Sequence, residues 1–104
     1  MLVEVSGERL LLQRDPEQKQ RLSSRLSKIE GQVRGLGQMI EEDRYCGDII
    51  QQSAAIRAAL REVALLCIQD HLDAAIDYAG RASHKDRSAA IADMTNLLRS
   101  ALKQ

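Results

Sequence analysis

The chain contains no phenylalanine and no tryptophan, and only two tyrosines among its 104 residues. A core without large aromatics must be built from Leu, Ile, Val and Ala, which pack well between helices, whereas sheets favour β-branched and aromatic residues. The aromatic side chains on which many proteins stack single-stranded nucleic acid are also missing. The composition therefore predicts an all-α fold and argues against a single-strand binder.

Charge of one sign and long apolar runs are lacking as well. Fifteen basic residues balance fifteen acidic ones, so the net charge indicates no particular partner. No stretch approaches the roughly 18 apolar residues of a membrane span, and we expect no signal peptide. Two cysteines are too few for a disulfide framework and fit a reducing compartment. We therefore expect a single cytoplasmic domain that makes no contact with a membrane.

Local signals divide the chain into an N-terminal extension, residues 1–14, and a helical domain, residues 15–104. The extension shows no sustained period, and its short apolar groups suit a strand, a docking arm or a mobile tail. Asp15 and Pro16 then mark the start of a helix, which is expected to end near Asp43. Its apolar residues alternate at steps of four and three, as in a helix that packs along another: Leu22, Leu26, Ile29, Val33, Leu36 and Ile40.

A second helix is expected to begin from a cap at Asp43, with Cys46 in its first turn, and to reach about Ala79, where Gly80 would cap it. Such a helix is roughly 50 Å long. A chain of this size cannot cover it, so we expect it to pack against a second copy. Ser83 begins a capping box for a third helix.

Basic residues gather locally although the chain is neutral overall. Arg21, Arg25 and Lys28 follow helical spacing and form a basic ridge beside the apolar stripe of the first helix. The basic ridge is either a solvated helix face or a surface that binds DNA phosphates. The second interpretation gives these candidate DNA-binding residues: Arg21, Arg25, Lys28, Arg34, Arg57 and Arg61.

Four side chains carry the thiol and imidazole groups of the chain: Cys46, Cys67, His71 and His84. Cys46 stands 25 positions before His71, some 37 Å along a straight helix. One protomer cannot bring these two together, but an antiparallel pair of such helices can. The spacing therefore predicts a Cys46–His71 site shared between protomers, with Cys67 as either a third ligand or part of the core. We expect His84 to belong to a helix cap.

The position of Cys46 suits a sensor as well as a ligand. The first turn of a helix attracts negative charge, and Arg44 nearby adds to that attraction. A thiolate held there could bind a metal ion or attack an electrophile.

Four segments together resemble the CsoR/RcnR family of bacterial transcriptional repressors: Arg25–Gly35, Glu42–Cys46, Gln51–Arg57 and Asp70–Leu72. The similarity covers roughly residues 16 to 103. Branches of this family sense copper(I), nickel or cobalt, formaldehyde, or persulfides. The resemblance implies a three-helix protomer, an antiparallel four-helix-bundle dimer and a disc-shaped tetramer. Inducer binding at the dimer interface would release double-stranded operator DNA.

The resemblance also implies roles for single residues. Cys46 would supply the thiolate, and His71 of the other protomer would supply the imidazole. Tyr45 and Asp93 would contact these two ligands without binding the inducer themselves. Ala75 departs from the family pattern, because the copper branch has a second cysteine there and the nickel–cobalt branch a histidine. The formaldehyde branch lacks a ligand at that position but has a proline next to its initiator, whereas Pro16 is internal.

These patterns favour a transcriptional repressor over two other classes. Its inducer would be copper(I) or another transition metal, or formaldehyde or another thiol-reactive species. The alternative is a helical protein-interaction module without DNA binding, whose basic ridge faces acidic partners. The sequence does not predict an enzyme, because it shows neither a nucleophile–base set nor a phosphate loop.

Overall fold

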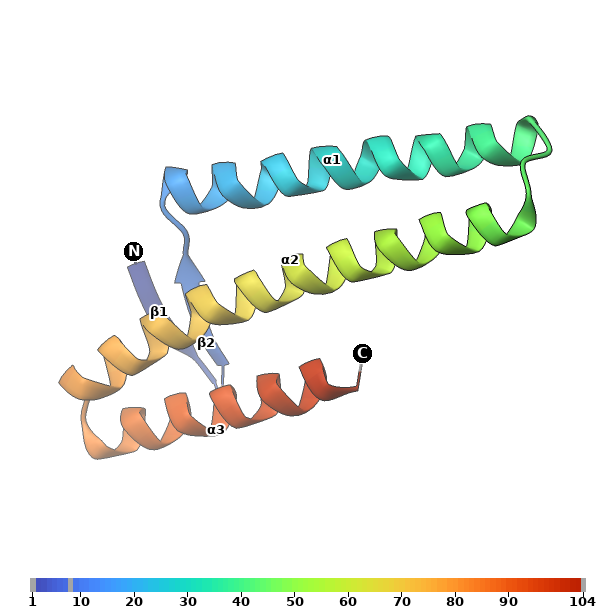
Figure 1. Cartoon of the computed structure of the whole chain (residues 1–104). Helices are drawn as coiled ribbons and strands as arrows, with labels where there is room; N and C mark the ends of the chain where they lie inside the picture. Colours follow the sequence, from blue (N-terminus) through green and yellow to red (C-terminus); the bar gives the residue numbers. More distant parts are fainter. Residues whose placement is uncertain (1, 8, 104) are drawn as a thin grey trace.

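The computed structural model describes residues 2–7 and 9–103 and contains a β-hairpin followed by three helices (Figure 1). The three-helix protomer is confirmed. The helices are α1 (Pro16–Glu41), α2 (Cys46–Arg81) and α3 (His84–Leu102).

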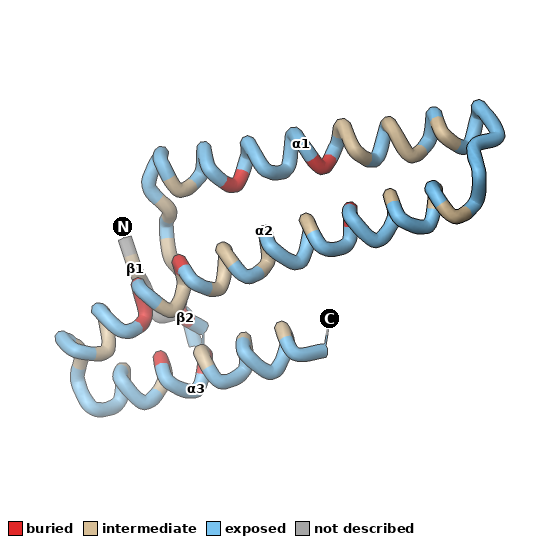
Figure 2. The backbone as a smooth tube through the Cα atoms, in the orientation of Figure 1, coloured by how far each residue is buried: buried red, intermediate tan, exposed pale blue. Residues whose placement is uncertain are grey.

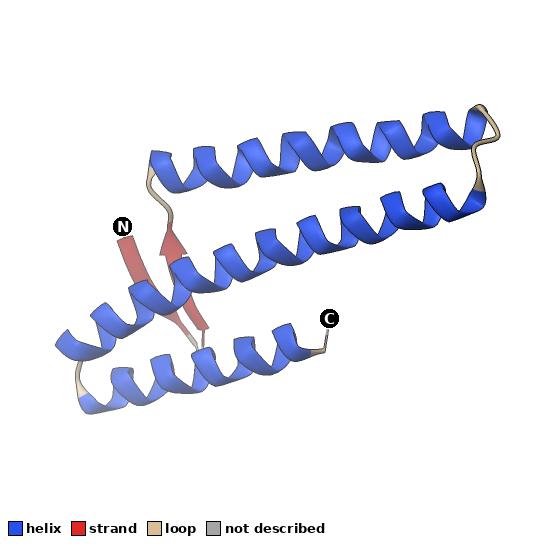
Figure 3. Cartoon of the chain, in the orientation of Figure 1, coloured by secondary structure: helices blue, strands red, loops and turns tan. Residues whose placement is uncertain are grey.

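The N-terminal extension forms the hairpin, so the strand alternative is the right one and the all-α prediction omits this element (Figure 3). Strands β1 (Leu2–Ser6) and β2 (Arg9–Gln13) pair antiparallel, with Val3 opposite Leu12. Gly7 has a φ of 62° at the turn, a conformation that glycine adopts without strain. Two strands of five residues are too short to produce a clear alternating pattern in the sequence.

The molecule is long and thin, with principal extents of 59 × 28 × 18 Å. Helices α1 and α2 run antiparallel, and α3 folds back along the C-terminal half of α2, where the hairpin also lies (Figure 1). In the described part of the chain, no helix is both long enough and apolar enough to span a bilayer.

Helix α1 begins as predicted. The Asp15 carboxylate accepts a hydrogen bond from the backbone N–H of Gln18 at 2.9 Å, and the Gln18 side chain accepts one from the N–H of Asp15 at 3.0 Å. This reciprocal capping box satisfies two of the free N–H groups at the helix start. The helix ends at Glu41, two residues before the predicted end.

Asp43 does not cap α2, and that prediction is wrong. Its φ of 53° places it in the left-handed region, which aspartate tolerates better than most residues. There it lets the N–H of Arg44 donate to the carbonyl of Met39 at 3.0 Å, which closes the end of α1. The N-cap of α2 is Tyr45, so Cys46 is the first residue of the helix and lies in its first turn, as predicted.

The C-terminus of α2 also differs from the prediction, because the helix passes through Gly80 and ends at Arg81. The Arg87 side chain donates a hydrogen bond to the carbonyl of Ala79 at 2.9 Å. A carbonyl in the last turn of α2, which has no partner within the helix, is therefore satisfied by a side chain of α3 and needs no glycine cap. Ser83 caps α3 as predicted, accepting from the N–H of Asp86 at 3.3 Å.

The apolar stripe of α1 divides between two surroundings. Leu22 and Ile29 are buried against the rest of the protomer, whereas Leu26, Val33 and Ile40 are 47%, 51% and 57% exposed. Buried residues are few along the tube of Figure 2. The row with Leu22 and Ile29 therefore packs inside the protomer, and the row with Leu26, Val33 and Ile40 remains on its surface.

Candidate functional site

His71 and Asp93 form a partly buried pair where α2 crosses α3. The Nε2 atom of His71 lies 2.7 Å from Oδ2 of Asp93, and the two side chains are 15% and 11% exposed. Ala75 and Ala90, one turn away on each helix, are almost completely buried. A neutral imidazole that donates its Nε2 proton to a carboxylate keeps a lone pair on Nδ1. With Nε2 directed at Asp93, the ring nitrogen of His71 that could bind a metal ion is Nδ1.

Cys46 lies at the opposite end of α2 and is exposed. The ring of its neighbour Tyr45 lies over Gly47, where an added Cβ would come within 2.5 Å of the Tyr45 Cε2 atom. Glycine at this position therefore leaves space for the ring beside the first turn of α2. The Tyr45 side chain itself stays largely exposed.

A single protomer does not bring Cys46 and His71 together. Both belong to one continuous helix of 36 residues, so the length of α2 keeps them apart. No group of three potential metal ligands forms among the residues that the structure describes in one protomer. Cys67, one turn before His71, is partly buried. Ala75 is completely buried and offers no donor atom.

Asp70 is a buried carboxylate for which the sequence predicts no role. It is 4% exposed and accepts hydrogen bonds from Nε of Arg14 at 3.3 Å and from Nη2 of Arg21 at 3.2 Å. Arg14 also donates to the carbonyl of Cys67 at 3.1 Å. In the sequence Asp70 follows the apolar run 63–68 of α2 closely, and a carboxylate buried there needs charged partners.

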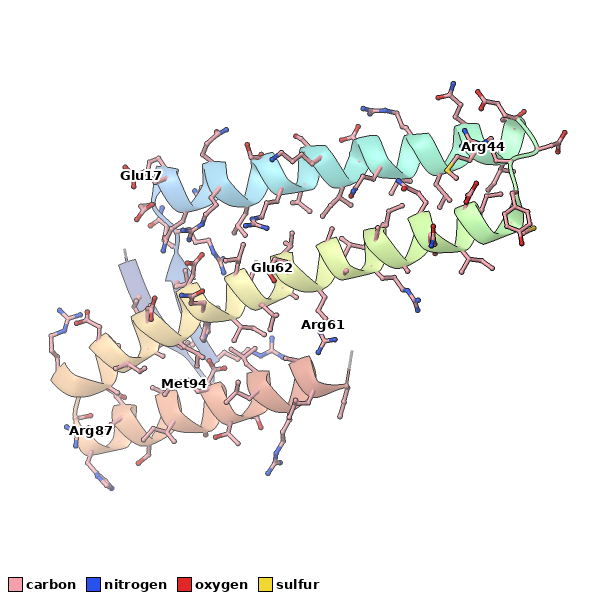
Figure 4. The ribbon with its side chains drawn as sticks, viewed as in Figure 1. Glu17, Arg44, Arg61, Glu62, Arg87 and Met94 are labelled. Atoms are coloured by element: carbon pink, nitrogen blue, oxygen red, sulfur yellow. The ribbon has the colours of Figure 1, made fainter. Side chains whose placement is uncertain are left out.

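The predicted DNA-binding residues form more than one group. Arg21, Arg25 and Lys28 line a groove between α1 and α2, together with Ser24 and Ala59. The remaining three lie elsewhere: Arg34 pairs with Glu30 at 2.8 Å, and Arg57 and Arg61 line a hollow on α2 beside Leu60 and Leu65. In Figure 4 the Arg61 side chain points away from α1. The protomer alone thus presents one basic groove and a separate basic pair.

Comparisons with known proteins agree on one family. The sequence profile of the family described as metal-sensitive transcriptional repressor matches residues 18–100. The copper-sensing transcriptional repressor RicR of Mycobacterium tuberculosis is 50% identical over 56 residues, which make up 54% of this chain and 58% of RicR. The chain thus spans little more than half the length of this curated relative.

Solved structures show the same similarity over most of the chain. The copper-sensing repressor CsoR with Cu(I) from Geobacillus thermodenitrificans has a TM-score of 0.74 at 32% identity, covering 86% of this chain and 92% of that one. A variant of the formaldehyde-responsive regulator FrmR from Salmonella enterica serovar Typhimurium has a TM-score of 0.72 at 30% identity, covering 86% and 99%. Residues 1–17 lie outside the segment that the family profile matches.

Proposed function

The chain belongs to the family of metal-sensitive transcriptional repressors, and from this premise we propose that it binds double-stranded operator DNA and releases it when an inducer occupies Cys46 and His71. The observation that carries the proposal is the position of these residues on α2. An imidazole oriented by Asp93 lies near one end, and an exposed thiol lies at the other. An antiparallel pair of α2 helices would place each thiol beside the partner's imidazole and create two sites per dimer.

The surface of α2 supports this antiparallel pairing. If Cys46 lies opposite His71 of the partner, the two-fold axis passes midway between them, at Ala58 and Ala59. A hollow at this place on α2 is lined by alanines and leucines together with three charged side chains: Ala54, Ala58, Ala64, Leu60, Leu65, Arg57, Arg61 and Glu62. Small side chains allow two helices to approach closely, and the half-exposed leucines would gain cover from the partner.

We infer a four-helix-bundle dimer made of α1 and α2 from each protomer. It would also cover the exposed row of the α1 stripe. Exposed apolar residues on α3, among them Ile91 and Leu102, are available for joining two such dimers into a disc-shaped tetramer.

The donor atoms fit an ion that accepts few, soft ligands. Cys46 offers a sulfur and His71 an imidazole nitrogen, while the buried Ala75 offers none. Cys67 could add a second sulfur from the same face of α2 as His71. Copper(I) is bound by small sets of soft ligands, whereas nickel and cobalt sites use more nitrogen and oxygen donors. We therefore propose copper(I) as the inducer, which when bound would link the two protomers through these donors.

A thiol-reactive aldehyde is the second candidate inducer, because Cys46 is exposed and Ala75, one turn after His71, offers no donor atom. With formaldehyde, the Cys46 sulfur would add to the carbonyl carbon, and the carbonyl oxygen would take up the thiol proton. The product is an S-hydroxymethyl cysteine, with no oxidant or reductant consumed. The similarity to formaldehyde-responsive FrmR supports this alternative.

The basic groove formed by Arg21, Arg25 and Lys28 supports DNA as the partner. Symmetric assembly would repeat these charges along the particle, and the repeated charges would neutralise several phosphates of a duplex. Sequence preference would then come mainly from DNA shape. We expect the protein to act in the cytoplasm, where cellular DNA is accessible and thiols stay reduced.

Titration of the DNA upstream of the protein's own gene tests the proposal. Fluorescence anisotropy would compare the wild type with Cys46→Ala and with Cys67→Ala as the matched control. We expect the wild type to bind the duplex and to release it on addition of copper(I) or of formaldehyde. Cys46→Ala should bind equally well and fail to release, and Cys67→Ala should keep the formaldehyde response.

Two other outcomes would contradict the proposal. A Cys46→Ala protein that no longer binds DNA without inducer would show that the thiol is structural. A wild type without affinity for duplex DNA would favour the interaction module instead.

A further inference from the structure

One turn of α2, from Cys67 to Asp70, is held by an arginine from outside the segment that the family profile matches. Arg14 lies between β2 and α1 and reaches across to α2. Its Nε atom donates to Asp70 Oδ2 at 3.3 Å, and its Nη2 atom donates to the carbonyl of Cys67 at 3.1 Å. One guanidinium thus binds both ends of the turn that immediately precedes His71.

The second oxygen of the same carboxylate binds the basic ridge of α1. Nη2 of Arg21 lies 3.2 Å from Asp70 Oδ1. The Arg14 side chain is 25% exposed, whereas that of Arg21 is 52% exposed, so the two arginines differ in their access to solvent. We name this group, made of Arg14, Arg21, Asp70 and the Cys67 carbonyl, the Asp70 clamp.

The clamp and the candidate inducer site are neighbours along the chain but face different elements. Asp70 contacts Arg21 of α1 and Arg14 before it, while His71 contacts Asp93 of α3. The same turn of α2 is therefore tied to both flanking helices. A displacement of His71 along or around the helix axis must change the Asp70 contacts, because the two residues share one rigid backbone segment.

The hairpin keeps Arg14 in position. Leu10 of β2 is 3% exposed, and both strands contact α2 and α3. The hairpin is anchored to the same two helices that carry His71 and Asp93, and Arg14 follows directly after its last residue, Gln13. The Arg14 guanidinium also gives the buried Asp70 carboxylate a second positively charged partner besides Arg21.

We propose that Arg14 is a positioning residue for the inducer response, acting through the Asp70 clamp to transmit a change at His71 to Arg21 and the basic ridge. This inference rests on the proposed function, since it assumes that His71 binds the inducer and that the ridge binds DNA. The N-terminal hairpin thereby becomes part of the regulatory apparatus of this chain.

The test compares Arg14→Gln with Arg9→Gln in the full-length protein. Both variants remove one arginine charge from the N-terminal extension, but Arg9 is an exposed residue at the start of β2. Operator affinity is measured without inducer, with copper(I) and with formaldehyde. Inducers that act through coupled sites change affinity by about 5- to 150-fold. We expect Arg14→Gln to lose most of this inducer-dependent change in operator affinity, while its affinity without inducer stays within about twofold of wild type. Arg9→Gln should keep the full inducer-dependent change.

A second readout does not depend on an inducer. The ¹⁵N resonances of the His71 ring report which nitrogen carries the proton, and a His84→Gln background leaves only this histidine. In Arg14→Gln we expect these resonances to shift from their wild-type values, because the turn that orients His71 is then held by two fewer hydrogen bonds. In Arg9→Gln they should remain unchanged.

These readouts separate the possible failures. If Arg14→Gln is less stable but inducer still changes its operator affinity as much as in the wild type, the inference is overturned. Arg14 would then have only a structural role. If the wild type releases DNA with neither probe, the proposed function has failed. The ring resonances then decide whether Arg14 positions His71: a shift supports that role, and unchanged resonances overturn it.

Discussion

The imidazole Nε2 of His71 lies 2.7 Å from the Asp93 carboxylate, so α3 determines which nitrogen of the ring stays free. Asp93→Asn keeps the shape of the side chain but can donate its amide N–H to Nε2, which would move the ring proton to Nδ1. Because Nδ1 would then lack its lone pair, we expect copper(I) to release operator DNA only at about 10- to 100-fold higher concentration. Anisotropy titrations would measure this shift.

The control for Asp93→Asn is Asp73→Asn, which changes an exposed carboxylate on α2. It should leave the copper(I) midpoint unchanged. If Asp93→Asn also leaves the midpoint unchanged, His71 does not bind the inducer through Nδ1.

The proposed two-fold axis makes Ala58 the place where two α2 helices meet. In a protein whose native cysteines are replaced by serine, Ala58→Cys should form an intermolecular disulfide, because symmetry brings the two new thiols face to face. Non-reducing electrophoresis after mild oxidation would show the cross-linked dimer.

Ser27→Cys, on the exposed surface of α1, is the matched control for the cross-link. It should give little dimer at the same protein concentration. Equal cross-linking of both variants, or none at Ala58→Cys, would contradict the antiparallel register with Cys46 opposite His71.

The basic ridge predicts a particular dependence on salt. Replacing Arg25 and Lys28 by Gln removes two charges from the groove between α1 and α2. The plot of log affinity against log salt should become shallower by about 0.9 for each DNA phosphate that the variant no longer neutralises. Arg81→Gln, at the far end of α2, should give a line parallel to the wild type. Parallel lines for all three proteins would show that the groove is a solvated face.

The helices and the separation of Cys46 from His71 could be predicted because they depend on local rules. Helix starts follow from Asp15 and Ser83, whose side chains cap the adjacent N–H groups. The distance between Cys46 and His71 follows from the rise of a helix, once α2 is known to be continuous. Resemblance also pointed to Asp93, which the structure places against His71.

What could not be predicted depends on contacts between distant parts of the chain. The Asp70 clamp joins residues separated by 56 and 49 positions, and no local pattern indicates which arginine reaches a buried carboxylate. The predicted caps at Gly80 and Asp43 are wrong for a related reason. The end of α2 is completed by Arg87 of the next helix, and the turn after α1 is completed by a left-handed aspartate.

Tyr78, near the end of α2, is expected to make the stability of the fold depend on pH in the alkaline range. Partial burial raises the pKa of the Tyr78 phenol above its usual value of 10.0, and the charge of Asp86 and a hydrogen bond to it raise the pKa further. The folded state therefore holds this proton more tightly than the unfolded chain does. The resulting stability is fully present below pH 10 and is lost as the pH rises through the raised pKa.

Thermal unfolding of Tyr78→Phe and Tyr45→Phe at a series of pH values checks this expectation. The melting temperature of Tyr78→Phe should fall less steeply above pH 10 than that of the wild type, because the variant has no phenol there to ionise. Tyr45→Phe should follow the wild-type curve, since it leaves the Tyr78–Asp86 contact intact. If all three proteins lose stability in parallel above pH 10, ionisation of Tyr78 does not govern the alkaline limit of the fold.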